Sequence, residues 1–232
     1  MSCICIIPAR GGSKRIPKKN IKLFSGKPII HYSIEAALNS NLFDTVMVST
    51  DDDEIAQIAL NAGAVVPFMR SAGNANDTAG TAAVLIEVLN QYATQQIKPD
   101  YACCLYATAP FVTPALMQDA FDLLVKENYD TVFPVVAFDY PVQRGLLLNN
   151  GLVSMREPEH ATSRSQDLEP VYHDAGQFYF FTPGSLLQTG HLWAGKTGGL
   201  PLHSLLAQDL DTPEDWEAAE WKYQYAKNKG WL

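Results

Sequence analysis

The chain has few cysteines and no long apolar segment. Its 232 residues contain four cysteines, at Cys3, Cys5, Cys103 and Cys104. Neither pair has the spacing of zinc ligands, so small buried side chains in a reducing compartment are the favoured interpretation. No apolar run approaches the roughly 20 residues of a membrane-spanning helix, and no cleavable signal peptide is recognisable. We therefore expect a cytoplasmic protein that does not associate with membranes.

Acidic residues are missing from the beginning of the chain, although the chain as a whole is acidic. The formal net charge is −8, which argues against a general nucleic-acid-binding protein. Residues 1–34 nevertheless contain no Asp or Glu, while seven of the 17 basic residues lie there: Arg10, Lys14, Arg15, Lys18, Lys19, Lys22 and Lys27. Such a cationic segment favours the binding of a small polyanion, and a solvated basic loop is the alternative.

The composition and the order of the elements predict an α/β fold. Hydrophobic residues make up 47% of the chain and charged residues 18%, which excludes a disordered, collagen-like or coiled-coil protein. Strands are expected at 4–7, 45–49, 65–68, 101–106, 131–138 and 177–181. Helices are expected at 28–39, 51–63, 78–94, 113–127 and 213–227. This alternation is typical of a doubly wound, mostly parallel sheet in a single domain spanning residues 1–232.

The alternating pattern is interrupted between Asp139 and Val171. Asn150-Gly151 lies there between two apolar runs, which predicts a hairpin, and the residues that follow are polar. We interpret this segment as an insertion on the α/β domain.

Two common phosphate-binding motifs are absent, the P-loop G-x-x-x-x-G-K-[S/T] and the dinucleotide fingerprint G-x-G-x-x-G. The first strand instead leads into the segment Pro8-Ala9-Arg10-Gly11-Gly12-Ser13-Lys14-Arg15, with Lys19-Asn20 close behind. Glycines after a parallel strand let backbone N–H groups approach phosphate oxygens, and nearby cations neutralise the charge. The carboxyl end of such a strand is also where a ligand is expected in an open α/β sheet.

Asp209-Leu210-Asp211 is a candidate metal site. In an extended segment the two carboxylates point to one side while Leu210 packs behind them. Mg²⁺ prefers one or two carboxylates together with substrate phosphates and water. The alternative is that Asp211-Thr212-Pro213 only caps the last helix.

These segments carry a family resemblance. Residues 7–20 resemble the N-terminal signature of the nonulosonic-acid cytidylyltransferases, the CMP-sialic acid synthetase family. Further segments follow in that family's order: 48–51, Arg70 with Asp77-Thr78, 108–110 and 209–211. Residues 102–111, 164–169 and 172–179 are most similar to the branch that activates pseudaminic acid. Sialic acid enzymes typically carry Gln where this chain has Tyr106, which argues against N-acetylneuraminate as the substrate.

The resemblance implies a reaction and a set of roles. CTP and a nine-carbon 2-keto sugar acid would give a CMP-sugar and pyrophosphate, through attack of the anomeric hydroxyl on the α-phosphate. The residues implied to bind the nucleotide are Arg10, Gly11, Gly12, Ser13, Lys14, Lys19, Asn20, Arg70, Asp77 and Thr78. Asp209 and Asp211 would hold Mg²⁺, as one ion or a pair, and with Arg10 and Lys19 would form the catalytic set.

The residues that would contact the sugar are less closely defined. Arg144 and Arg164 are candidates for its carboxylate, although each is equally well explained as a surface arginine. Further candidates are Tyr106, Gln177 and Tyr179 on expected strands, with Gln143, Phe178 and His173 as weaker ones. Relatives are homodimers whose inserted segment reaches toward the partner's active site, and surface-glycan or flagellin modification is the usual destination of the product. Two alternatives remain: activation of another ulosonic acid, such as legionaminic or N-acetylneuraminic acid, and a nucleotide-binding module without turnover.

Overall fold

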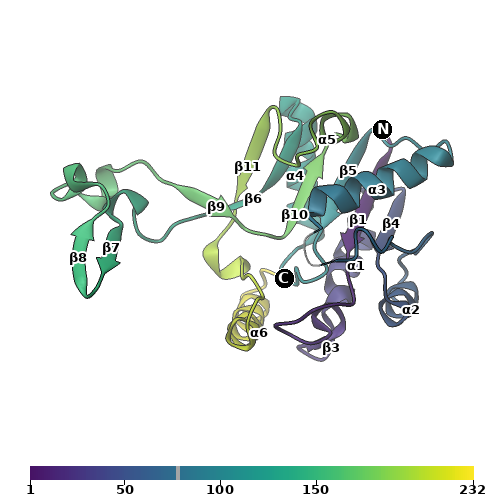
Figure 1. The fold of residues 1–232 in the computed structure, drawn as a ribbon, viewed down its shortest axis with the longest axis horizontal. Coiled ribbons are helices and arrows are strands. Elements are labelled where there is room, and N and C mark those ends of the chain that lie inside the picture. Colours follow the sequence, from purple (N-terminus) through teal and green to yellow (C-terminus); the bar gives the residue numbers. More distant parts are fainter. Residues whose placement is uncertain (77–78) are drawn as a thin grey trace.

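The computed structural model describes residues 1–76 and 79–232 and is built around one mixed β-sheet. The strand order is β11-β6-β10-β5-β1-β4, and β9 pairs with β6 (Figure 1). The strands are β1 (Cys3–Pro8), β4 (Thr45–Ser49), β5 (Tyr101–Leu105), β6 (Thr131–Ala137), β9 (Tyr172–Asp174), β10 (Phe178–Phe181) and β11 (Thr197–Pro201). Only β9 and β10 run against the other five, because β10 is antiparallel to β5 and β6 and β9 is antiparallel to β6. The predicted α/β fold is confirmed, with parallel core strands in a mixed sheet.

Helices cover both faces of the sheet, as a doubly wound fold requires. Cys3, Cys5 and Ile7 of β1 belong to a core shared with α1, α2 and α4, whereas Ile4 and Ile6 belong to a core shared with α3 and α5. This alternation follows from the two-residue period of a strand, which sends successive side chains to opposite faces. The helices are α1 (Ile29–Ser40), α2 (Asp53–Asn61), α3 (Thr81–Thr94), α4 (Pro114–Glu127), α5 (Pro183–Thr189) and α6 (Pro213–Asn228).

Local capping residues define where several helices begin. The Asp52 carboxylate accepts from the backbone N–H groups of the first turn of α2, and the Thr113 hydroxyl does the same for α4. Thr212 begins α6 through a capping box with Asp215. Each cap satisfies backbone donors that the helix itself cannot pair, which is why these starts are readable from the sequence. Helix α3 begins at Thr81, and the predicted start at Thr78 lies outside the described residues.

The expected strand at Val65–Phe68 is wrong. Only Val65 pairs with the sheet, through one parallel bridge to Met47. Pro67 has no backbone N–H, so it cannot continue a ladder, and the chain turns toward Thr50, whose carbonyl accepts from the Arg70 N–H at 2.8 Å.

The insertion projects away from the body of the molecule as an arm (Figure 1). Strands β7 (Leu146–Asn149) and β8 (Leu152–Met155) pair as an antiparallel hairpin at its far end, which confirms the hairpin predicted at Asn150-Gly151. Both turn residues have positive φ, 50° and 81°, as a two-residue hairpin turn requires. At the base of the arm the Phe138 N–H donates to the Val171 carbonyl at 2.9 Å. We call residues 139–171 the arm.

The four cysteines are buried and free, as the sequence predicted. Burial raises the pKa of the Cys104 thiol far above its ordinary value, so it stays protonated. None of the helices formed by the described residues combines the length and apolar character needed to cross a bilayer.

Candidate active site

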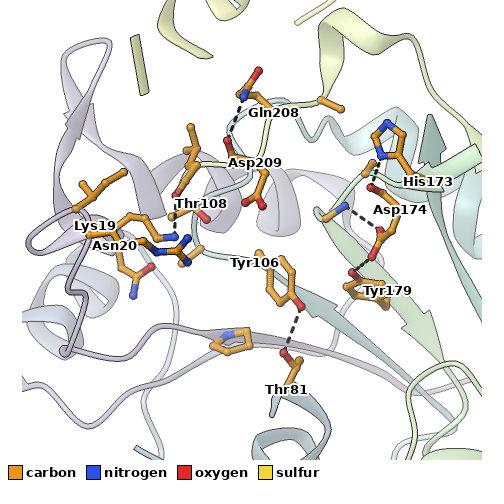
Figure 2. Close-up of a pocket in the computed structure, with 18 of the residues that line it drawn as sticks. Lys19, Asn20, Thr81, Tyr106, Thr108, His173, Asp174, Tyr179, Gln208 and Asp209 are labelled. Atoms are coloured by element: carbon orange, nitrogen blue, oxygen red, sulfur yellow. Dashed lines mark hydrogen bonds between the residues drawn. The ribbon is translucent and has the colours of Figure 1, made fainter. Parts of the chain in front are cut away.

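A cleft of about 940 Å³ opens at the carboxyl end of β1 (Figure 2). Strand β1 lies between β4 and β5. The next strand of the sheet along the chain, β4, lies on one side of β1, and the one after it, β5, lies on the other side. Ligands of open α/β sheets bind at such a switch point. Ten of the candidate site residues named from the sequence line this cleft: Arg10, Ser13, Lys14, Lys19, Asn20, Arg70, Tyr106, His173, Tyr179 and Asp209.

The loop after β1 is held in place by its own backbone and by the start of α2. The Gly11 N–H donates to Asp51 Oδ1 at 3.0 Å, and Asn20 Nδ2 donates to the Arg10 carbonyl at 2.9 Å. Asn20 is buried, so its amide ties the end of the loop back to the beginning. The cationic side chains of Arg10, Lys14 and Lys19 are thereby gathered at one end of the cleft.

Gly11 is required by close packing. A Cβ at this position would lie 2.6 Å from Asp52 Oδ2 and 2.9 Å from Asp52 Cβ. Gly11→Ala therefore displaces the carboxylate that caps α2. We expect a loss of about 1–3 kcal/mol of unfolding free energy from overpacking, measured as a lower melting temperature by calorimetry.

Gly12→Ala is the matched control for this prediction. No atom lies within 4 Å of a Cβ built on Gly12. The melting temperature of Gly12→Ala should therefore stay within about 2 °C of the wild type, since it introduces no new contact. Equal melting temperatures for the two variants would contradict the packing that we describe at Gly11.

Arg70 is buried at the rear of the cleft, with 9% of its surface exposed. Its Nε donates to Ser49 Oγ at 3.1 Å and its Nη2 donates to the Ser49 carbonyl, at the end of β4. Burial lowers the pKa of this guanidinium, and the carboxylates of Asp51 and Glu87 oppose that shift. Asp77 and Thr78, which the sequence placed beside Arg70, lie outside the described residues.

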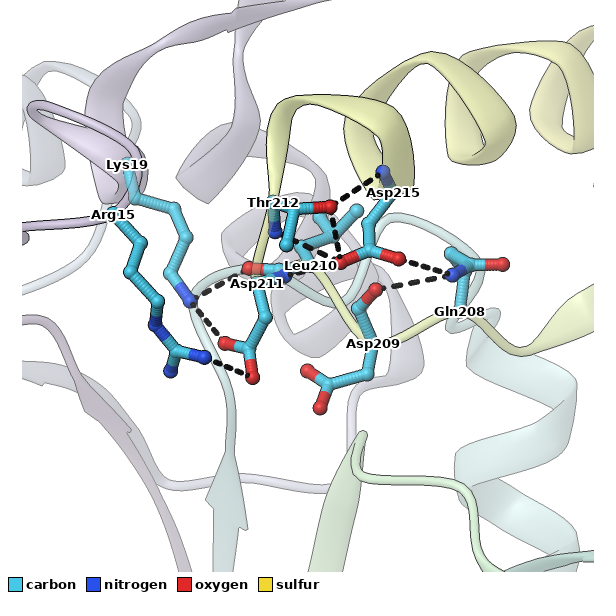
Figure 3. A network of polar contacts seen from close by, with 8 residues as sticks. All are labelled: Arg15, Lys19, Gln208, Asp209, Leu210, Asp211, Thr212 and Asp215. Carbon is cyan, nitrogen blue, oxygen red and sulfur yellow. Dashed lines mark hydrogen bonds and ion pairs between the residues drawn. The ribbon is translucent and has the colours of Figure 1, made fainter. Parts of the chain in front are cut away.

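The Asp209–Asp211 segment lies against the cationic loop (Figure 3). Lys19 Nζ donates to the Leu210 carbonyl at 2.8 Å and lies 3.6 Å from Asp211 Oδ1. Arg15 Nη1 lies 2.7 Å from Asp211 Oδ2. Leu210 is buried in an aromatic cluster with Trp216 of α6, as expected for the side chain behind the two carboxylates.

The two carboxylates differ in their partners. Asp211 takes part in both ion pairs, whereas Asp209 lines the cleft and its carboxylate makes no hydrogen bond or ion pair with the described part of the chain. The segment Asp211-Thr212-Pro213 does begin α6, because Thr212 forms a capping box with Asp215. The Asp211 carboxylate itself takes no part in that box and pairs with Arg15 and Lys19 instead. Residues 1–76 and 79–232 contain no group of three or more His, Cys, Asp or Glu side chains able to hold a metal. A cation here would therefore need ligands from a bound molecule as well.

Two tyrosines form the wall opposite the loop. The rings of Tyr106 and Tyr179 meet edge to face, with centroids 5.7 Å apart. The Tyr106 hydroxyl lies 3.2 Å from Thr81 Oγ1, and the Tyr179 hydroxyl donates to Asp174 (Figure 2). Burial raises the pKa of both phenols, so both remain neutral donors.

Of the remaining predicted sugar-binding residues, His173 lines the cleft, whereas the others lie outside it. Gln177 is buried, donates through Nε2 to the Leu206 carbonyl, and does not line the cleft. Phe178 is fully buried in the core. Arg144 and Arg164 are on the arm, where Arg144 Nη1 lies 3.4 Å from Ser165 Oγ.

Other lining residues were missed. Asp174, at the end of β9, and Lys222, on α6, both line the cleft, and the sequence predicted a site role for neither. Lys222 is one of two lysines on α6, the other being Lys227, and no local pattern distinguishes the two.

The mixed sheet and its cationic cleft define an α/β protein of the nucleotidyltransferase type. Residues 4–184 match the family model described as cytidylyltransferase. The chain is 43% identical over 225 residues to the pseudaminic acid cytidylyltransferase of Campylobacter jejuni, which covers 97% of both chains. It is 32% identical over 229 residues to the CMP-N,N'-diacetyllegionaminic acid synthase of Legionella pneumophila, covering 95% of each.

A solved structure has a similar fold. The structure of CMP:2-keto-3-deoxy-manno-octonic acid synthetase complexed with CTP superposes with a TM-score of 0.71 at 19% identity, covering 98% of this chain and 100% of that one. The chain belongs to the cytidylyltransferase family, as the resemblance of residues 7–20 indicated.

Proposed function

We propose that the protein transfers CMP from CTP to the anomeric hydroxyl of pseudaminic acid, with release of pyrophosphate. The observation that carries this proposal is the meeting of the cationic loop with the Asp209–Asp211 segment through Lys19 in one cleft. The extensive identity with a pseudaminic acid cytidylyltransferase supports the choice of sugar acid.

The loop suits a triphosphate. Phosphoryl transfer requires little covalent chemistry from the protein, so positioning and charge neutralisation dominate. Arg10, Lys14 and Lys19 supply cations in the cleft. No atom lies within 4 Å of a Cβ built on Gly12, whereas the Gly11 N–H is held by Asp51. Lys19 is oriented by the Leu210 carbonyl and Asp211, so its ammonium is already placed to stabilise charge that develops on the phosphates.

We propose that Asp209 and Asp211 hold Mg²⁺. Their hard oxygen donors fit this ion, which commonly binds one or two carboxylates and completes its shell with phosphate and water. The Asp209 carboxylate lies at the cleft wall and has no partner among residues 1–76 and 79–232, which supports this assignment. When bound, the ion would supply positive charge against the phosphate oxygens.

The tyrosine wall suits the sugar. Tyr106 and Tyr179 pack together, and Val84 and Val136 also line the cleft, so the cleft offers apolar surface besides its charged groups. An apolar wall can accommodate the methyl terminus of a deoxy sugar, while Asp174 and His173 offer polar groups for its substituents.

The test is pyrophosphate release from CTP and Mg²⁺ with pseudaminic, legionaminic and N-acetylneuraminic acids in parallel. We expect release with pseudaminic acid at a kcat/KM at least about tenfold above the others, equivalent to about 1.4 kcal/mol of discrimination. Faster release with another acid would overturn the assigned sugar and keep the reaction. CTP binding without release in any reaction would favour a module without turnover.

We also propose that the protein is a homodimer formed through the arm. Leu148 and Val153 are a cross-strand pair on the hairpin and are 71% and 62% exposed. Leu146 and Leu152 are also exposed. An isolated two-stranded hairpin is only marginally stable, and exposed apolar patches commonly mark interfaces. Arg144 and Arg164 would reach a bound sugar only from such a partner's arm.

Light scattering coupled to size-exclusion chromatography tests the dimer. We expect twice the 25.5 kDa of one chain for the wild type. Leu148→Lys with Val153→Glu keeps the cross-strand pair through opposite charges and should give a monomer. A wild-type monomer with full activity would contradict the proposal.

A further inference from the structure

Lys222 brings a cation to the cleft from α6. Its Nζ donates to the Ala207 carbonyl at 2.9 Å and lies 3.5 Å from the Ser204 carbonyl. No carboxylate in the described part of the chain lies within ion-pair distance of it. An ammonium has three donors, so this one retains capacity for a further acceptor.

The position of Lys222 separates it from the phosphate loop. Ala207, to which it donates, packs with Val136 of β6 and with Ala175, which directly follows β9. The other Lys and Arg side chains that line the described cleft lie in the loop, apart from Arg70: Arg10, Lys14, Arg15 and Lys19. If the nucleotide occupies the end of the cleft beside the loop, Lys222 is the lining cation at the opposite end.

The surroundings of this ammonium favour an anionic ligand. Burial lowers its pKa, and the charge of Asp139 opposes the shift without forming an ion pair. His173 and Asp174 are the other titratable groups that line this end. A partly desolvated cation without a counter-ion is stabilised when a carboxylate binds beside it.

We propose that Lys222 binds the carboxylate of the sugar acid and thereby selects acids over neutral sugars. This proposal rests on the proposed function. It assigns the contact with the sugar carboxylate to a residue of the chain that forms the cleft, whereas the sequence analysis named Arg144 and Arg164 as candidates for that contact. Those arginines lie on the arm, outside the cleft of their own chain.

The experiment compares three substitutions at one position. Lys222→Gln keeps an N–H donor for the Ala207 carbonyl, Lys222→Met removes charge and donor, and Lys222→Arg keeps the charge. Lys227→Met removes the same charge from an exposed position on the same helix and is the control. Steady-state kinetics are measured with the sugar acid that the wild type accepts best, and with the amide of its carboxyl group.

Loss of a charge-assisted hydrogen bond should raise the KM for the acid about 10- to 100-fold in Lys222→Gln and Lys222→Met. The KM for CTP should stay within about twofold, and the preference for acid over amide should collapse in both variants. Lys222→Arg should retain most of that preference, and Lys227→Met should match the wild type.

Two results would overturn the proposal. One is an unchanged preference for acid over amide in Lys222→Met. The other is a wild-type KM in Lys222→Gln with a defect confined to Lys222→Met, which would make the residue only an anchor for the Ser204–Leu206 turn. If the wild type accepts another acid but not pseudaminic acid, the proposed substrate is overturned, and the Lys222 variants are compared with the acid that is accepted.

Discussion

Asp209→Asn is expected to lower pyrophosphate release by about 10²–10³-fold, the scale seen when one electrostatic group that stabilises a transition state is removed. The carboxylate faces the cleft and has no partner among the described residues, so its charge is available to a cation. Asparagine keeps the shape and removes the charge. The melting temperature should therefore stay unchanged while activity and the response to Mg²⁺ are lost, which calorimetry and a magnesium titration measure.

Two further variants make this result specific. Asp211→Asn should also reduce activity, but it breaks the ion pairs with Arg15 and Lys19 and so disturbs the loop as well. Glu214→Gln removes a carboxylate from an exposed position at the start of α6 and should leave activity within about twofold. Activity of Asp209→Asn close to the wild type, with the same magnesium dependence, would contradict the assignment of Asp209.

Lys19→Met is expected to lower kcat/KM for CTP by at least about 10²-fold, because it removes the ammonium held between the loop and the Asp209–Asp211 segment. Methionine preserves most of the length and apolar volume of the side chain. The loss should fall mainly on kcat if Lys19 stabilises charge that develops during transfer, and on KM if it only attracts CTP. Initial-rate kinetics over a range of CTP concentrations separate the two.

Lys18→Met is the control for Lys19→Met. Lys18 is the preceding residue, is exposed, and pairs with Glu54 of α2 away from the cleft. Because exposed ion pairs contribute little, this variant should keep activity within about threefold and leave the melting temperature almost unchanged. Similar losses in both variants would mean that total loop charge, rather than the placement of Lys19, determines activity.

The features that the sequence predicted depend on short-range chemistry. The loop after β1 was recognisable because glycines and cations directly follow an apolar strand, and the helix starts because Asp52 and Thr113 cap them locally. Both kinds of signal involve residues that are close together in the chain, so they can be recognised without knowledge of the fold.

The features that the sequence missed depend on distant partners. β10 looks like any apolar strand, and its antiparallel direction follows from its neighbours β5 and β6. β11 contains Gly198 and Gly199, which disfavour strands locally but are needed because a Cβ would lie 2.6 Å from Tyr129 and 3.1 Å from Val135. Lys222 reaches the cleft only because α6 packs beside the Ser204–Leu206 turn.

The most direct test of the proposed reaction is product analysis after incubation with CTP, Mg²⁺ and pseudaminic acid. Mass spectrometry and phosphorus NMR would follow the nucleotide and the phosphate products together. We expect CMP-pseudaminic acid and pyrophosphate in equal amounts, with no product when the sugar acid is omitted. Consumption of CTP to free CMP, or no consumption under conditions where CTP binds, would contradict the transfer that we propose.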